Sequence, residues 1–167
     1  VKEARALGVV SIANYNCPGQ LVIGGEAEAV TKASELALEK GARRAIPLNT
    51  SGPFHTELLA PASNELKEKF VSVNFNEMQV PVIFNSSAKE LESGVSIAQM
   101  LEKQVMSSVY FEDSIRYMLE NGVDTIIEIG PGKVLSGFIR KIDKTIKTYQ
   151  VEDQASLEKT LAGLKGE

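Results

Sequence analysis

The chain has 167 residues, of which 43% are apolar and 24% are charged, a composition typical of a globular protein of about one domain. Its 18 Lys and Arg residues against 22 Asp and Glu residues leave a net charge of −4, which argues against general nucleic-acid binding. One His and one Cys are too few for a His/Cys zinc site, and no apolar stretch approaches the roughly 18 to 20 residues that span a bilayer. We therefore expect no metal site, no membrane insertion and a cytoplasmic location.

The beginning of the chain has the pattern of the end of a helix. Residues 2–8 read as the last turns of a helix that Gly8 closes. The chain also starts at Val1 without a Met. We expect a C-terminal part of a longer polypeptide, although processing would give the same start.

The next segments predict most of a split β-α-β unit. Residues 9–14 and 20–24 are short, apolar and β-branched, and a turn with Pro18-Gly19 joins them, which predicts a hairpin. A helical period follows over residues 29–40 and ends at Gly41, and residues 44–48 read as a further strand. This order lacks only the opening strand of the unit.

From Asn49 onward the pattern changes, and we place a boundary between a small subdomain (1–48) and a second region (49–167) there. A polar loop precedes a helix over residues 58–70. Helices and strands then alternate, which favours helices on a mostly parallel sheet. The expected strands are 80–84, 125–129 and 146–151, and the expected helices are 97–105, 111–120, 134–139 and 156–164.

Only a few residues could carry chemistry. His55 lies in a loop before a helix, where catalytic groups concentrate, but a structural histidine would have the same pattern. Residues 130–133 (GPGK) follow a strand and open a helix, so they form either an anion site or, more simply, a tight turn. The sequence contains no Gly-x-Ser-x-Gly motif, so these residues supply a possible base without a nucleophile.

Four segments together resemble a known family. They are residues 14–25 (NYNCPGQLVIGG), 52–55 (GPFH), 103–105 (KQV) and 128–135 (EIGPGKVL), and in this order they resemble the malonyl-CoA:acyl carrier protein transacylases of bacterial fatty-acid synthesis. The resemblance implies an α/β fold in which residues 1–48 form most of a ferredoxin-like small subdomain. Residues 49–167 would then be the C-terminal part of an α/β-hydrolase-like acyltransferase core.

The resemblance also implies roles for individual residues. His55 matches the catalytic base of the family, and Gln104 matches the residue whose backbone carbonyl orients that imidazole. Phe54 matches a position that restricts the acyl pocket, and Asn16 is a candidate substrate-binding residue that hairpin geometry alone would also explain. Three positions match those that present positive charge to the acidic carrier protein, where plain solvation is an equal alternative: Arg43, Arg44 and Arg140.

The implied reaction moves a malonyl group from malonyl-CoA to the phosphopantetheine thiol of acyl carrier protein through a serine ester. It needs no cofactor, since the coenzyme A thioester is the substrate. The nucleophilic serine would lie in a missing N-terminal portion, so this chain alone is expected to be inactive. The alternatives are the acyltransferase domain of a polyketide synthase and a ferredoxin-like binding module without catalysis.

Overall fold

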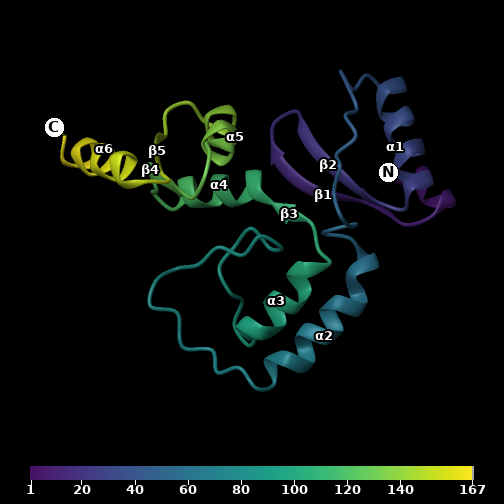
Figure 1. Ribbon diagram of the computed structural model, residues 1–167, viewed down its shortest axis with the longest axis horizontal. Helices are drawn as coiled ribbons and strands as arrows, with labels where there is room; N and C mark the ends of the chain where they lie inside the picture. Colours follow the sequence, from purple (N-terminus) through teal and green to yellow (C-terminus); the bar gives the residue numbers. More distant parts are fainter. Residues whose placement is uncertain (167) are drawn as a thin grey trace.

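The computed structural model describes residues 1–166 as a mixed α/β protein with two small sheets and helices around them (Figure 1). The elements in chain order are the 3-10 helix η1 (Ala4–Leu7), strands β1 (Val10–Cys17) and β2 (Gln20–Gly25), helix α1 (Ala27–Glu39), the 3-10 helix η2 (Glu57–Leu59), helices α2 (Ala60–Phe70) and α3 (Ile97–Val105), strand β3 (Val109–Tyr110), helix α4 (Phe111–Glu120), strand β4 (Thr125–Ile129), helix α5 (Val134–Ile142), strand β5 (Lys147–Val151) and helix α6 (Gln154–Lys165).

The predicted hairpin is confirmed, and its first strand is longer than expected. Strands β1 and β2 pair antiparallel, and Cys17 stands opposite Gln20 across the two-residue turn. Gly19 in that turn has φ 76°, a conformation that glycine adopts without steric cost. Two shifts of register, after Ile12 and after Tyr15, insert extra residues into β1 and bend it.

Helix α1 packs on this hairpin and ends as the sequence predicts. The amide of Gly41 donates to the Leu38 carbonyl (3.0 Å) and that of Ala42 to the Ala37 carbonyl (2.9 Å), the pair of hydrogen bonds that closes a helix through a left-handed glycine. The core between helix and hairpin is built from small side chains. It consists of Ala4, Val10, Ala29 and Ala33.

Two predicted strands are wrong within the part of the chain that the structure describes. Residues 44–48 follow α1 without regular secondary structure, and all five are exposed, with Ile46 and Leu48 each 61% exposed. Residues 80–84 are likewise irregular, apart from a single bridge between Phe84 and Lys89. A strand exists only when a neighbour takes up its backbone hydrogen bonds, and no described segment lies beside either of these two in a ladder.

Helices α2 and α3 pack against each other in the lower half of Figure 1. The predicted bounds of α3 are confirmed. Ser96 and Gln99 form a reciprocal capping box, which determines where the helix starts. Beyond α3, the short strand β3 pairs parallel with β1, through Asn14 opposite Val109 and Tyr15 opposite Tyr110. Strand β3 is only two residues long and was not predicted from the sequence.

The C-terminal elements confirm the predicted alternation. Strands β4 and β5 pair parallel over five residues, and helices α4 and α5 enclose a second core of Ile115, Ile139 and Ile146. Strand β4 is open on one face, because Ile127 is 39% exposed and Ile129 is 83% exposed. The coarse α/β class is therefore confirmed, with one mixed sheet and one parallel sheet.

Candidate functional site

His55 has an unusual backbone conformation. It lies half-buried in the loop between α1 and η2 with φ 61°, and among the described non-glycine residues only Ala88 shares a positive φ. Such a conformation costs about 1 to 3 kcal/mol and persists only where the surroundings hold it, which is common at functional sites. The loop around His55 must therefore contain contacts that stabilise it.

Two contacts hold this loop. The Thr56 side chain is 1% exposed, and its hydroxyl donates to the Pro53 carbonyl at 2.7 Å. The loop also lies against Gly24 of β2, where an added Cβ would come 3.3 Å from the Thr56 Cγ2 and 3.4 Å from the Phe54 carbonyl oxygen. Strand β2 of the hairpin therefore packs directly against the residues on both sides of His55.

The imidazole of His55 does not make the hydrogen bond to Gln104 that the resemblance to transacylases implies. Its Nδ1 is buried and has no partner among the described residues. The carbonyl of Gln104, the expected partner, accepts hydrogen bonds from the amides of Met106 and Ser107 instead. The expected contact between His55 and Gln104 is therefore absent from this structure, and the chain leaves a buried ring nitrogen unpaired, which native proteins rarely do.

The two segments that carry these residues nevertheless converge on the same hairpin. The Ser108 hydroxyl, shortly after α3, donates to the Ile12 carbonyl of β1 at 2.6 Å, while the His55 loop lies on Gly24 of β2. The Ser63 hydroxyl of α2 donates to the Glu102 carbonyl of α3 at 2.8 Å. The segment after α3 and the His55 loop thus both contact the hairpin, and α2 is bonded to α3.

The remaining predicted site residues are dispersed. Phe54 is 51% exposed, and Asn16 is half-buried at the second register shift of β1, close to the hairpin turn. All three candidate carrier-binding arginines are exposed: Arg43 and Arg44 after α1, and Arg140 on α5. In Figure 1 the β1–β2 hairpin lies between helix α5 and the end of α1.

Acidic side chains of this chain occupy the possible anion site at residues 130–133. Glu128 of β4 accepts hydrogen bonds from the amides of Leu135 (3.1 Å) and Ser136 (2.8 Å) and from the Ser136 hydroxyl (2.6 Å). The Gly132 amide donates to Glu152 at 2.9 Å. Burial opposes the ionisation of Glu128, but these hydrogen bonds outweigh it and lower its pKa below the ordinary value. The tight-turn interpretation is the one that fits this geometry.

Comparison with known proteins adds to this geometry. No protein-family model matches the chain. It is 48% identical over 159 residues to the malonyl CoA-acyl carrier protein transacylase of Bacillus subtilis, covering 95% of this chain and 50% of that protein. It is 36% identical to the transacylase of Escherichia coli K12, covering 96% of this chain and 52% of that protein. The chain is homologous to the C-terminal portion of these transacylases.

Solved transacylase structures have the same fold over the same extent. The Clostridium perfringens enzyme superposes with a TM-score of 0.95 at 43% identity, covering 99% of this chain and 52% of that one. The Streptococcus pneumoniae enzyme gives a TM-score of 0.92 at 51% identity, covering 97% and 53%. The chain therefore spans about half the length of the transacylases it matches.

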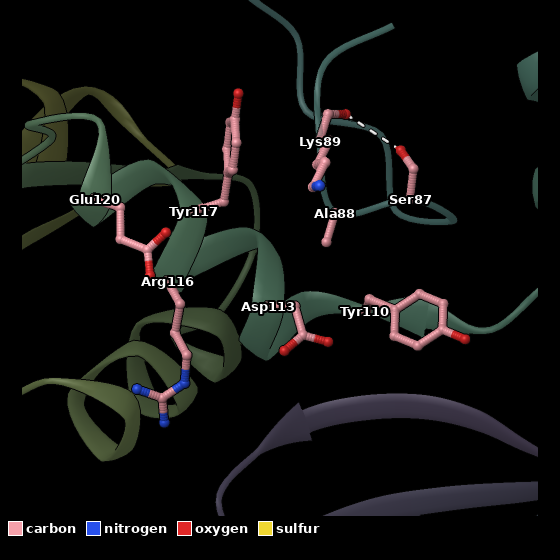
Figure 2. A pocket seen from close by; sticks show the side chains of 8 residues that line it. All are labelled: Ser87, Ala88, Lys89, Tyr110, Asp113, Arg116, Tyr117 and Glu120. Carbon is pink, nitrogen blue, oxygen red and sulfur yellow. Dashed lines mark hydrogen bonds between the residues drawn. The ribbon is translucent and has the colours of Figure 1, made fainter. Parts of the chain in front are cut away.

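A pocket of 440 Å³ lies away from His55, between residues 87–89 and helix α4 (Figure 2). Its wall carries charges of both signs, and the Ser87 hydroxyl is bonded to the Lys89 carbonyl (3.3 Å). None of the predicted site residues lines it. Within residues 1–166, no cluster of His, Cys, Asp or Glu could hold a metal ion, and no helix is long and apolar enough to cross a membrane.

Sequence reasoning missed the residues that support His55. A glycine inside a strand can indicate close approach of another backbone, so Gly24 carried a signal that was available. Thr56 carried none, because a threonine before a helix is ordinarily a cap.

Proposed function

We propose that this chain is the C-terminal part of a malonyl-CoA:acyl carrier protein transacylase, and that the assembled enzyme transfers malonyl groups into fatty-acid biosynthesis. One observation carries the proposal. The similarity to transacylases extends over at least 95% of the chain, at 48% and 43% identity.

The reaction follows from the chemistry of a thioester and a hydroxyl. A serine outside these residues attacks the malonyl thioester carbonyl while His55 accepts the hydroxyl proton, and the coenzyme A thiolate leaves and takes that proton from the imidazolium. The thiol of the carrier protein then attacks the serine ester, and His55 again moves one proton from the thiol to the serine. No step is an oxidation or a reduction, and we propose that the enzyme needs no cofactor, since the coenzyme A thioester is its substrate.

Gln104 is proposed to orient the imidazole in the assembled enzyme. The buried Nδ1 of His55 lacks a partner. A backbone carbonyl has two lone pairs, and those of Gln104 accept the amides of Met106 and Ser107 in this structure. In the assembled enzyme the imidazole would take the place of the Ser107 amide, whose bond is long at 3.4 Å. A neutral carbonyl is sufficient because a thiolate leaves more readily than an amine, and the imidazolium therefore needs less stabilisation.

Specificity and docking are proposed for the exposed residues. Phe54 would crowd an α-methyl branch on the acyl group, which is worth about 1 to 3 kcal/mol of discrimination, and Asn16 would contact substrate from the hairpin. The arginines at positions 43, 44 and 140 would meet the acidic carrier. A related structure, 36% identical with a TM-score of 0.91, holds a malonyl-transacylase in complex with a type II polyketide synthase acyl carrier protein.

We further propose that residues 1–48 belong to a ferredoxin-like subdomain, that residues 49–167 belong to an α/β-hydrolase-like core, and that the protein is cytoplasmic. The paired β1 and β2 with α1 on them support the first assignment. The parallel pair β4 and β5, with α5 between them in the chain, supports the second.

Intact-mass spectrometry of the full-length protein after incubation with malonyl-CoA tests this function. We expect one covalent malonyl group, which disappears when acyl carrier protein is added. Acetyl-CoA and methylmalonyl-CoA serve as competitors and should label the protein less. Failure to form any malonyl adduct would overturn the proposal.

A further inference from the structure

Thr56, directly after His55, is the one buried residue of the loop that carries the histidine. Residues 49–55 are exposed or half-buried, whereas Thr56 is 1% exposed. Its hydroxyl donates to the Pro53 carbonyl at 2.7 Å. This bond closes a ring around Phe54 and His55, so it constrains the backbone on both sides of the imidazole.

The direction of the Thr56 side chain is unusual for its position. Thr56 precedes η2 with extended backbone angles (φ −130°, ψ 163°), and its carbonyl accepts the amide of Leu59 at 3.1 Å. A threonine there ordinarily caps the helix with its hydroxyl, but its side chain makes no such bond. The hydroxyl turns back into the loop instead, which indicates that its contribution is to the His55 conformation rather than to the helix.

Gly24 of β2 provides the space for this arrangement. Its φ is not in the left-handed region, so its backbone does not require glycine. A Cβ at this position would come within 3.3 Å of the Thr56 methyl, which is a tight contact, and would meet the Phe54 carbonyl oxygen at 3.4 Å, in ordinary van der Waals contact. A methyl group at Gly24 would therefore require the Thr56 methyl, and with it the segment that bears His55, to shift by a few tenths of an ångström.

We propose that Thr56 is a positioning residue, seated on Gly24, that holds the His55 backbone in its left-handed conformation and so sets the direction of the imidazole. This inference rests on the proposed function of His55 as the base. Without the Thr56 hydroxyl, the loop relaxes toward a negative φ at His55, and the ring swings away from the reacting hydroxyl. A displacement near 1 Å costs on the order of a hundredfold in rate.

The test compares Thr56→Val, which keeps the shape and removes the donor, with Thr56→Ser, which keeps the donor, in the full-length protein. For Thr56→Val we expect kcat for malonyl transfer to fall about 10- to 100-fold, with KM for malonyl-CoA nearly unchanged. Thr56→Ser should recover most of that loss. A merely structural role of the hydroxyl would instead lower the amount of active Thr56→Val protein and leave kcat per active site unchanged.

Two further variants separate the possible outcomes. If His55→Ala leaves transfer intact, the proposed function itself fails. If His55→Ala abolishes transfer while folded Thr56→Val retains wild-type kcat, only the positioning role is overturned. Should Thr56→Val not fold, Gly24→Ala decides, because it keeps the hydroxyl. We expect it to lower kcat without raising KM, and a wild-type kcat would refute the inference.

Discussion

The carboxylate of Glu128 provides the most direct test of how the loop at residues 130–133 works. Helix α5 begins at Val134, so the amides of Leu135 and Ser136 belong to its first turn and have no partner within the helix. Glu128 accepts both of them and also the hydroxyl of Ser136, which is 7% exposed. A negative charge of the chain itself therefore occupies the site that an anion would otherwise fill.

The expected cost of removing this carboxylate follows from its contacts. A hydrogen bond to a charged group contributes about 1.5 to 3 kcal/mol, and a charge at a helix N-terminus about 0.3 to 1 kcal/mol, both reduced by the partial exposure of Glu128. We expect Glu128→Ala to lower the free energy of unfolding by about 2 kcal/mol, since it also leaves Ser136 without an acceptor. Glu128→Gln keeps an acceptor and should cost about 1 kcal/mol.

The dependence on pH has a definite sign. The pKa of Glu128 in the folded protein lies below its ordinary value of 4.5, so the carboxylate stabilises the fold fully above that pH. The contribution is lost as the pH falls through the folded pKa. In Glu128→Gln this part of the acid sensitivity should disappear, and the free energy of unfolding should vary less below pH 4.5.

Urea unfolding of the full-length protein followed by circular dichroism measures these effects. A loss of about 2 kcal/mol moves the midpoint by roughly 1 M urea. Glu120→Gln, an exposed position at the end of α4, is the matched control and should leave the midpoint unchanged. The reasoning is refuted if Glu128→Ala unfolds at the wild-type midpoint, or if inorganic phosphate stabilises the wild-type protein but not a protein whose residues 130–133 are replaced.

Two other perturbations test the packing around the site. Ile139→Ala, in the core between α4 and α5 where Ile139 is 2% exposed, should lower the free energy of unfolding by about 2 to 5 kcal/mol. Val134→Ala, 62% exposed on the same helix, should change it by less than about 0.5 kcal/mol, and equal effects would contradict the assigned core. Ser63→Ala removes the bond from α2 to the Glu102 carbonyl and should cost about 1 kcal/mol in urea unfolding; no change would show that this bond does not tie α2 to α3.

Helices were predictable from the sequence because their signals are local. The capping Ser96 with Gln99 and the glycines at positions 41 and 122 define helix ends within a few residues of sequence, and α3 and α4 begin and end where predicted. Strand β4 was likewise predicted with its correct bounds. For these elements the information lies in the segment itself.

The predicted strands at residues 44–48 and 80–84 are wrong because strand formation depends on a neighbouring strand, which the local sequence pattern does not reveal. Residues 44–48 contain the apolar side chains of Ala45, Ile46 and Leu48, yet nothing described pairs with this segment. Strand β3 shows the converse, since two residues become a strand because β1 lies beside them. A local sequence pattern indicates only the propensity of a segment to form a strand. Whether the strand forms depends on a neighbouring strand that accepts and donates its backbone hydrogen bonds.

The candidate site was only partly accessible to sequence reasoning. His55 could be selected because it is the single His and lies in a loop, and the resemblance to transacylases supplied Gln104. The hydroxyl of Thr56 and the space at Gly24 became visible only in three dimensions, because residues distant in sequence meet there. The unpaired Nδ1 of His55 was not expected, since the resemblance to transacylases implied a hydrogen bond from the ring to Gln104.

The rate of malonyl transfer to acyl carrier protein by full-length His55→Ala tests the central claim most directly. If His55 is the base for a serine outside this chain, the variant should fold like the wild type by circular dichroism and lose about 100- to 10,000-fold in kcat/KM. A folded His55→Ala protein that transfers malonyl groups within a few-fold of the wild-type rate would contradict the account.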